Sequence, residues 1–180
     1  MTMNRYKEQW LKNQYKIWES LVGIELNKMY AIPEPLDWYD EDETLPIHTH
    51  SSIHFQHFAK CWIVLNDNRI LKITTSEDED VYGVFISNVN KINDSDERLI
   101  EINYTGRIES SILKVEKDNI AEVNLTINGE TKIIASGEVE PQWDGYIIRK
   151  LDESILLFES QEDFDKTVFE KSIKIDLRNN

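Results

Sequence analysis

The residues best suited to metal or proton-transfer chemistry lie together in one short segment, residues 46–61, with the sequence PIHTHSSIHFQHFAKC. This segment contains the chain's four histidines and its single cysteine. Imidazole and thiolate groups are ligands for zinc, iron or copper, and imidazole also exchanges protons near neutral pH. Which of these side chains converge depends on the secondary structure that carries them.

Two local structures would each bring three of these side chains onto one face. An extended strand over residues 47–57 places alternate residues on the same side. The ligands on that side are His48, His50 and His54. A short helix capped by Ser51 groups a different set at helical spacing. The ligands on that face are His54, His57 and Cys61. Alternating apolar residues favour a strand for the second half of the segment, but the pattern leaves both arrangements open.

The stretch Pro46-Ile47-His48-Thr49-His50 resembles the first histidine pair of the cupin family, whose small β-barrels hold a metal on an HxH strand pair. The resemblance covers these five residues and implies a bound transition metal with oxygenase or isomerase chemistry. Cupins add a glutamate a few residues later, where this chain has His54, and a histidine on a later strand, where this chain has none. The complete cupin ligand set therefore cannot be assembled from this sequence.

No other established catalytic motif occurs in the chain. It has no GxSxG nucleophile elbow, no phosphate-binding P-loop and no dinucleotide-binding GxGxxG. No nucleophile, base and orienting acid can be grouped from the sequence, so no catalytic residue is assigned. We therefore expect a binding protein rather than an enzyme, with no cofactor unless the histidine segment holds a transition metal.

The charge of the chain excludes some partners and favours others. The net charge is −14, and the first 30 residues carry five basic and three acidic side chains, which leaves −16 on residues 31–180. Such a body repels nucleic-acid phosphates and anionic membrane surfaces, because binding to either depends on clustered Lys and Arg. A basic protein, in contrast, would be steered toward it. The sequence predicts a basic protein partner, no nucleic acid and no membrane.

The expected location is the cytoplasm. One cysteine cannot form an internal disulfide, so the chain gives no sign of an oxidising compartment. The first 18 residues contain no continuous apolar region and no small-residue cleavage site of a signal peptide. No apolar run approaches the roughly 18 residues of a membrane-spanning helix.

A helix, a loop and a long series of strands would carry these features in one domain, residues 1–180. Apolar residues at helical spacing predict an amphipathic helix over residues 4–29, within an N-terminal region of residues 1–30. Three prolines and no periodicity predict an acidic loop over residues 31–46. Residues 47–180 then form the β domain.

About nine strands follow one another in the β domain, joined by short turns without helical crossovers. Asn128-Gly129 is the strongest hairpin signal, and Asp67-Asn68, Asp144-Gly145 and Asp152-Glu153 mark further turns. Parallel pairing requires a crossover of about a dozen residues, so the sheet should be antiparallel. The expected fold class is α+β, mainly β: an N-terminal helix and an antiparallel meander that closes into a barrel or a two-layer sheet. Ser160 is expected to cap a short helix, with a last strand after it.

Three acidic stretches are candidate partner-binding surfaces, and two of them contain aromatic residues that could serve as anchors. They are residues 37–43, residues 77–80 and residues 138–144. The candidate contact residues are Trp38, Tyr39, Asp40, Glu41, Asp42, Glu43, Glu138, Glu140, Trp143 and Asp144. The resulting hypothesis is an immunity or inhibitor protein that occludes the active site of a basic, nuclease-like toxin. The alternatives are a small-molecule-binding β-barrel and a metal-dependent, cupin-like enzyme that uses residues 48–61.

Overall fold

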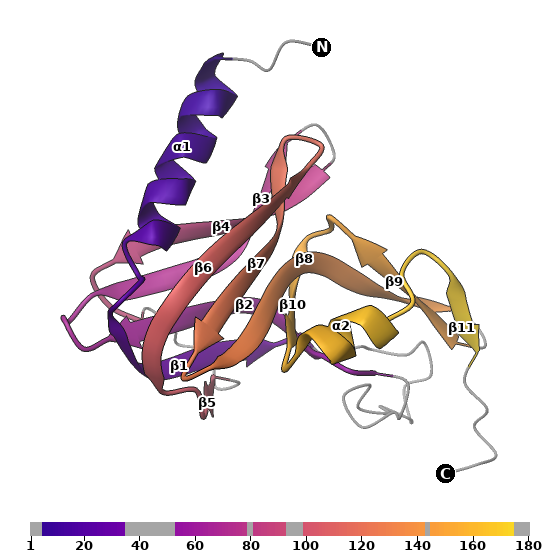
Figure 1. Cartoon of the computed structure of the whole chain (residues 1–180). Coiled ribbons are helices and arrows are strands. Elements are labelled where there is room, and N and C mark those ends of the chain that lie inside the picture. The colour runs from indigo at the N-terminus through magenta and orange to yellow at the C-terminus, as the bar shows by residue number, and fades with distance from the viewer. Residues whose placement is uncertain (1–4, 35–52, 79–80, 93–98, 143–144, 175–180) are drawn as a thin grey trace.

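The structure is a computed structural model that describes residues 5–34, 53–78, 81–92, 99–142 and 145–174 (Figure 1). It is mainly β, with one helix before the first strand and a short one between the last two strands. The elements in order are α1 (Arg5–Glu19), β1 (Glu25–Pro33), β2 (Gln56–Leu65), β3 (Ile70–Asp78), β4 (Val81–Val89), β5 (Ile100–Ile102), β6 (Gly106–Glu116), β7 (Asn119–Ile127), β8 (Glu130–Gln142), β9 (Gly145–Lys150), β10 (Ser154–Phe158), α2 (Gln161–Lys166) and β11 (Ser172–Lys174).

Six of these strands close into an antiparallel barrel, which confirms the predicted fold class. The pairing runs β8–β7–β6–β1–β2, and β10 completes the ring because it pairs with both β2 and β8. The remaining strands extend the ring: β3 and β4 continue from β2, β9 and β11 continue from β8, and β5 pairs with β1. All of these pairings between named strands are antiparallel, as short turns without crossovers require.

The predicted turns at Asp67-Asn68, Asn128-Gly129 and Asp152-Glu153 lie between strands as expected, while Asp144 of the fourth lies outside the described residues. Asn128 and Gly129 both have positive φ, 50° and 82°, as a two-residue hairpin between β7 and β8 requires. Asn68 has a φ of 68° in the turn between β2 and β3. Ser160 caps α2, since its side-chain oxygen accepts a hydrogen bond from the backbone N–H of Asp163. The strand predicted after α2 is also present, as β11.

The N-terminal helix is shorter than predicted, and the boundary between helix and β domain is therefore wrong. α1 ends at Glu19, Gly23 adopts a φ of 88°, and residues 25–33 form β1 in the middle of the barrel. The misassignment arose because apolar Leu21 and Ile24 continue the helical spacing. Both residues do pack on the core, but from the turn that follows the helix. Neither described helix combines the length and apolarity needed to cross a membrane.

A buried amide fixes α1 to the edge of the sheet. The Gln14 side chain is 3% exposed; its Nε2 donates to the carbonyl of Ile86 at 3.1 Å, and its Oε1 accepts from the Ile86 N–H at 2.9 Å. Gln14 thus satisfies both backbone groups of one residue on β4, as a neighbouring strand would. Trp10 stacks on Phe85 of the same strand. These contacts explain why α1 projects from one side of the barrel (Figure 1).

Two apolar clusters form the core on opposite faces of β8 and β10. The larger cluster fills the barrel and receives Ile134, Ile155 and Leu157 from these strands. The smaller one lies outside the barrel and contains Leu156 and Phe158, partly covered by Phe164 of α2 and by the segment that leads to β11. β10 is therefore buried on both faces, which explains its uninterrupted apolar sequence, SILLF.

Candidate functional site

The fold gathers carboxylates from four separate segments around Glu138 of β8 and Tyr82 of β4. Glu138 and Glu77 come from predicted acidic stretches, Asp152 and Glu153 from the turn between β9 and β10, and Glu34 follows β1 directly. We call this set the acidic surface: Glu34, Glu77, Glu138, Asp152 and Glu153. The other four acids each act electrostatically on Glu138 or on Tyr82.

The turn that carries Asp152 and Glu153 is held in place by Leu151. The Leu151 N–H donates to the carbonyl of Ser136 on β8, and the Leu151 carbonyl accepts from the N–H of Tyr82 on β4. Leu151 has a φ of 56° and is 8% exposed. These two bonds connect β8, β4 and the turn, so the acids after Leu151 are fixed beside Glu138 by the backbone.

Gly137 allows the close approach of strands immediately before Glu138. A Cβ at this position would lie 2.5 Å from the carbonyl oxygen of Arg149 and 2.8 Å from Cδ1 of Leu156. Both distances are shorter than real Cβ contacts, so glycine is required where β9 and β10 pack against β8. Glu138 thus directly follows a position where β9 and β10 both pack closely on β8.

No ion pair to Glu138 occurs among the described residues, and the largest influences on its pKa all raise it. Burial, followed by the carboxylates of Asp152, Glu153, Glu34 and Glu140, raises the pKa of Glu138 to about 7. Partial desolvation and the carboxylates of Glu77 and Glu153 likewise raise the pKa of Tyr82. A cation brought to this surface would relieve the repulsion among the acids, and would itself be attracted by all of them.

Glu140, two residues after Glu138, is in a different situation. Its Oε2 accepts from Nε and Nη2 of Arg149 at 2.8 and 2.6 Å, and Arg149 also pairs with Glu170 at 3.3 Å. Arg149 is the cross-strand partner of Glu138 in the β8–β9 register, yet its guanidinium is engaged by these other two acids. The predicted surface over residues 138–144 is therefore divided: Glu140 is neutralised locally and Glu138 is not.

Several predicted contact residues lie outside the described part of the chain. They are Trp38, Tyr39, Asp40, Glu41, Asp42, Glu43, Trp143 and Asp144. Their role as partner-binding residues stays a prediction. Sequence reasoning did not single out Glu34, Tyr82, Asp152 and Glu153, because it treated Asp152-Glu153 only as a turn. The available signal was that this turn follows the strand paired with β8, which places it near Glu138.

The histidine segment gives no metal site among the described residues. No group of three His, Cys, Asp or Glu side chains in these ranges could hold a metal ion. The helical arrangement is wrong, since residues 56–65 form β2, and Cys61 is fully buried in the barrel core, where burial raises the pKa of its thiol. His54 precedes β2, while His48 and His50 lie outside the described residues, so the strand trio stays a prediction.

His57 is the unusual member of this segment. Both of its ring nitrogens are buried without a hydrogen-bond partner among the described residues. Burial lowers the pKa of His57 to about 4, so the ring is neutral at neutral pH. His57 is therefore a neutral side chain of β2. The described residues provide no further ligands that would form a metal site with it.

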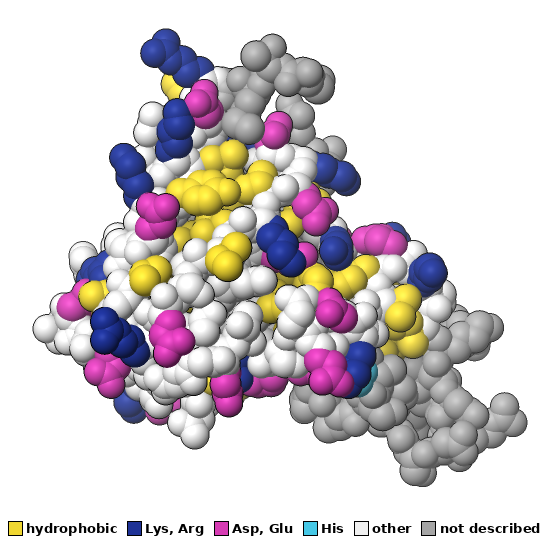
Figure 2. All heavy atoms as spheres, in the orientation of Figure 1, with side chains coloured by type: hydrophobic (Ala, Val, Ile, Leu, Met, Phe, Trp, Pro, Cys, Tyr) yellow, Lys and Arg dark blue, Asp and Glu magenta, His cyan; other side chains and the backbone are white. Residues whose placement is uncertain are grey.

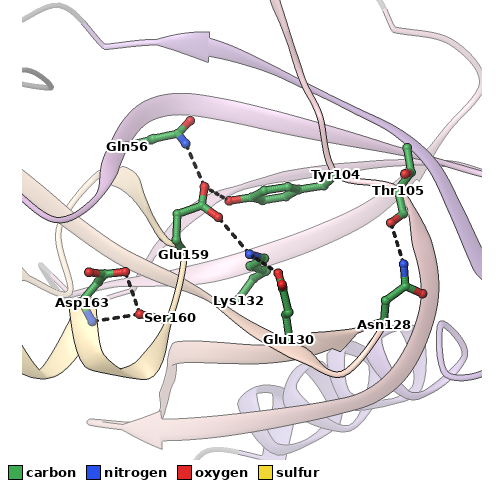
Figure 3. Close-up of polar contacts among 9 residues, drawn as sticks. All are labelled: Gln56, Tyr104, Thr105, Asn128, Glu130, Lys132, Glu159, Ser160 and Asp163. Carbon is green, nitrogen blue, oxygen red and sulfur yellow. Dashed lines mark hydrogen bonds and ion pairs between the residues drawn. The ribbon is translucent and has the colours of Figure 1, made fainter.

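A second polar cluster, shown in Figure 3, surrounds Glu159, the residue that follows β10. Glu159 accepts hydrogen bonds from Gln56, from the Tyr104 hydroxyl, and from Lys132 at 2.9 Å. Lys132 also pairs with Glu130 at 3.0 Å and lies over the Tyr104 ring. The donors and acceptors in this cluster pair with one another. They connect β2, β8, the end of β10 and the segment between β5 and β6, so the cluster has a structural role.

Comparisons with protein-family models, with curated proteins and with solved structures give no match to this chain.

Proposed function

We propose that this chain is an acidic protein-binding module, an immunity or inhibitor protein that neutralises a basic, nuclease-like toxin by occluding its active site. The acidic surface around Glu138 is the binding surface. Its carboxylates take the place of the nucleic-acid phosphates that the toxin's Lys and Arg side chains would otherwise contact. Tyr82, half-buried among the acids, supplies aromatic contact area.

The observation that carries this proposal is the repulsion at Glu138. Burial, and after it the carboxylates of Asp152, Glu153 and Glu34, raise the pKa of Glu138, while the guanidinium opposite it in the register is occupied by Glu140 and Glu170. Such a surface is stabilised by an incoming cation, so a partner that carries Lys or Arg gains both attraction and relief of repulsion. The net charge of −14 extends the attraction to longer range and accelerates the encounter.

The two alternative functions receive less support from the described residues. A six-stranded barrel is narrower than the eight-stranded barrels in which side chains only just fill the interior. Here the interior holds fully buried Cys61, Ile108, Val123 and Ile155, which leaves little room for a ligand. The metal-dependent alternative depends on a ligand set that the described residues do not provide.

The first test is genomic, followed by a binding assay. A neighbouring gene for a basic, secreted toxin domain would supply the candidate partner, and that domain is then produced and titrated with this chain. We expect a one-to-one complex that abolishes nuclease activity and weakens steeply as salt rises. A complex whose affinity is independent of salt would contradict the electrostatic mechanism.

A matched pair of variants then locates the surface. Neutralisation of the acidic surface by Glu138→Gln, Asp152→Asn and Glu153→Gln should slow association. The control changes net charge equally at exposed acids elsewhere, by Glu8→Gln, Glu116→Gln and Glu162→Gln. If both triple variants slow association to the same degree, net charge alone is responsible and the acidic surface is not the binding site.

A further inference from the structure

One strand of the barrel has an open edge. β6 pairs with β7 along its length, but it pairs with β1 only at its beginning, where Arg107 and Gly106 face Glu25 and Leu26. Backbone bonds between Ile108 and residues 23–24 end this contact. Beyond Ile108, this edge of β6 makes no backbone hydrogen bond to another described segment. α1 and β6 diverge toward the β6–β7 turn, so α1 does not cover the edge there (Figure 1).

The open edge contains one regular run with an apolar residue at its centre. Register shifts interrupt β6 between Ile108 and Ser110 and again between Lys114 and Val115. The regular run is therefore residues 110–114, and its midpoint is Ile112. Ile112 is 59% exposed, the highest value for any aliphatic side chain in the described ranges. Hydrophobic side chains are also visible at the surface in the gap between α1 and β6 (Figure 2).

The charge of β6 differs from that of the rest of the protein. The strand carries two bases, Arg107 and Lys114, and two acids, Glu109 and Glu116, so its net charge is zero in a chain of −14. Two copies of this protein would repel each other over most of their surface, but not at this strand. A neutral strand edge with an exposed isoleucine at its centre is complementary to itself.

We propose that β6 pairs with β6 of a second copy, antiparallel, about a two-fold axis at Ile112. In this register Ile112 faces Ile112 of the second copy, and Ser110 faces Lys114. No like charges stand opposite each other within the run, and the most exposed aliphatic side chain becomes buried. The proposal is independent of the acidic surface and of the function assigned to it.

The same geometry predicts a closed and weak dimer. A two-fold axis uses the edge of both copies at once, so the pairing ends at two chains and does not propagate into a fibre. The register shifts on either side limit the pairing to five residues. Such an interface is smaller than the roughly 1,200 Å² of a stable complex, so the dimer should dissociate on dilution.

Sedimentation equilibrium over a wide concentration series tests self-association. We expect a reversible monomer–dimer equilibrium for the unmodified chain and a monomer for Ile112→Lys, which places two lysines opposite each other. The matched control is Val168→Lys, at an aliphatic residue that is 45% exposed between α2 and β11. The control should dimerise like the unmodified chain. An unmodified chain that stays monomeric at millimolar concentration, or Ile112→Lys that dimerises normally, would overturn the proposal.

A disulfide test locates the axis without reliance on affinity. Directly opposed residues on antiparallel strands have Cα atoms about 4.5–5.5 Å apart, within the range that a disulfide spans. Ile112→Cys should therefore form a covalent dimer quickly under mild oxidation, whereas Val168→Cys should react slowly. The native Cys61 is fully buried and does not compete. Equal rates for the two variants would refute pairing at Ile112.

Discussion

Replacement of Glu138 by glutamine should stabilise the protein, and the gain should depend on pH. The pKa of Glu138 is raised from an ordinary 4.5 to about 7, so the folded state binds this proton more tightly than the unfolded state. The stability contributed by the protonated form is complete below pH 4.5 and is lost as pH rises through 7. Glutamine stays neutral and escapes that loss, so the variant should gain on the wild type across this interval.

The size of the gain follows from the shift. A shift of this size corresponds to about 3 kcal/mol at most, at roughly 1.4 kcal/mol per pKa unit. Glu138 is only half-buried, so solvent screening reduces the expected gain to about 1 kcal/mol. For a chain of this length that is an increase of about 2–4 °C in Tm.

Urea unfolding of Glu138→Gln and of the wild type, near pH 4 and near pH 8, measures this gain. We expect equal stability near pH 4 and greater stability of the variant near pH 8. The control is Glu140→Gln, which removes one of the two carboxylate partners of Arg149 and should be neutral or destabilising at both pH values. The reasoning is refuted if Glu138→Gln gives no gain near pH 8, or gives the same gain near pH 4.

Three further predictions concern residues that hold the fold together. The pKa of His57 is lowered by burial to about 4, so the unfolded state takes up this proton first as pH falls. The free energy of unfolding should therefore decrease by up to about 3 kcal/mol between pH 6.5 and pH 4. Acid unfolding curves of His57→Phe should show a smaller decrease. Gly137→Ala should lower the free energy of unfolding in urea by about 1–3 kcal/mol, because the added Cβ would lie 2.5 Å from the Arg149 carbonyl oxygen. A smaller decrease would mean that the strands move apart easily at this position. Gln14→Ala leaves both backbone groups of Ile86 without their partner and should cost about 2 kcal/mol, with faster amide exchange at Ile86; unchanged exchange there would contradict this role.

The local features of the fold could be predicted from the sequence because they depend on neighbouring residues. Asn128-Gly129 specifies a two-residue hairpin by its positive φ values, and Ser160 specifies a helix start by its side-chain oxygen. The end of α1 could not be predicted in this way, since Leu21 and Ile24 are apolar in either a helix or a turn that packs on the core. Closure of the barrel depends on β10 pairing with β2, about a hundred residues away, and no local pattern encodes that pairing.

The candidate site shows the same division. The acidic character of the segment around Glu138 is visible in the sequence. The separation of Glu138 from Glu140 is not, because it depends on where the Arg149 side chain binds across β8 and β9. Asp152 and Glu153 join the acidic surface through the bonds of Leu151 to Ser136 and Tyr82, and these contacts exist only in the folded chain.

The most direct test of the proposal is the association rate constant between this chain and a basic toxin domain whose gene is found beside its own, measured at low and high salt. For the unmodified chain we expect a fast rate that falls steeply with salt. Neutralisation by Glu138→Gln, Asp152→Asn and Glu153→Gln should lower the rate at low salt by about tenfold and flatten its salt dependence. An unchanged rate at low salt for this triple variant would contradict the claim that the acidic surface binds a basic partner.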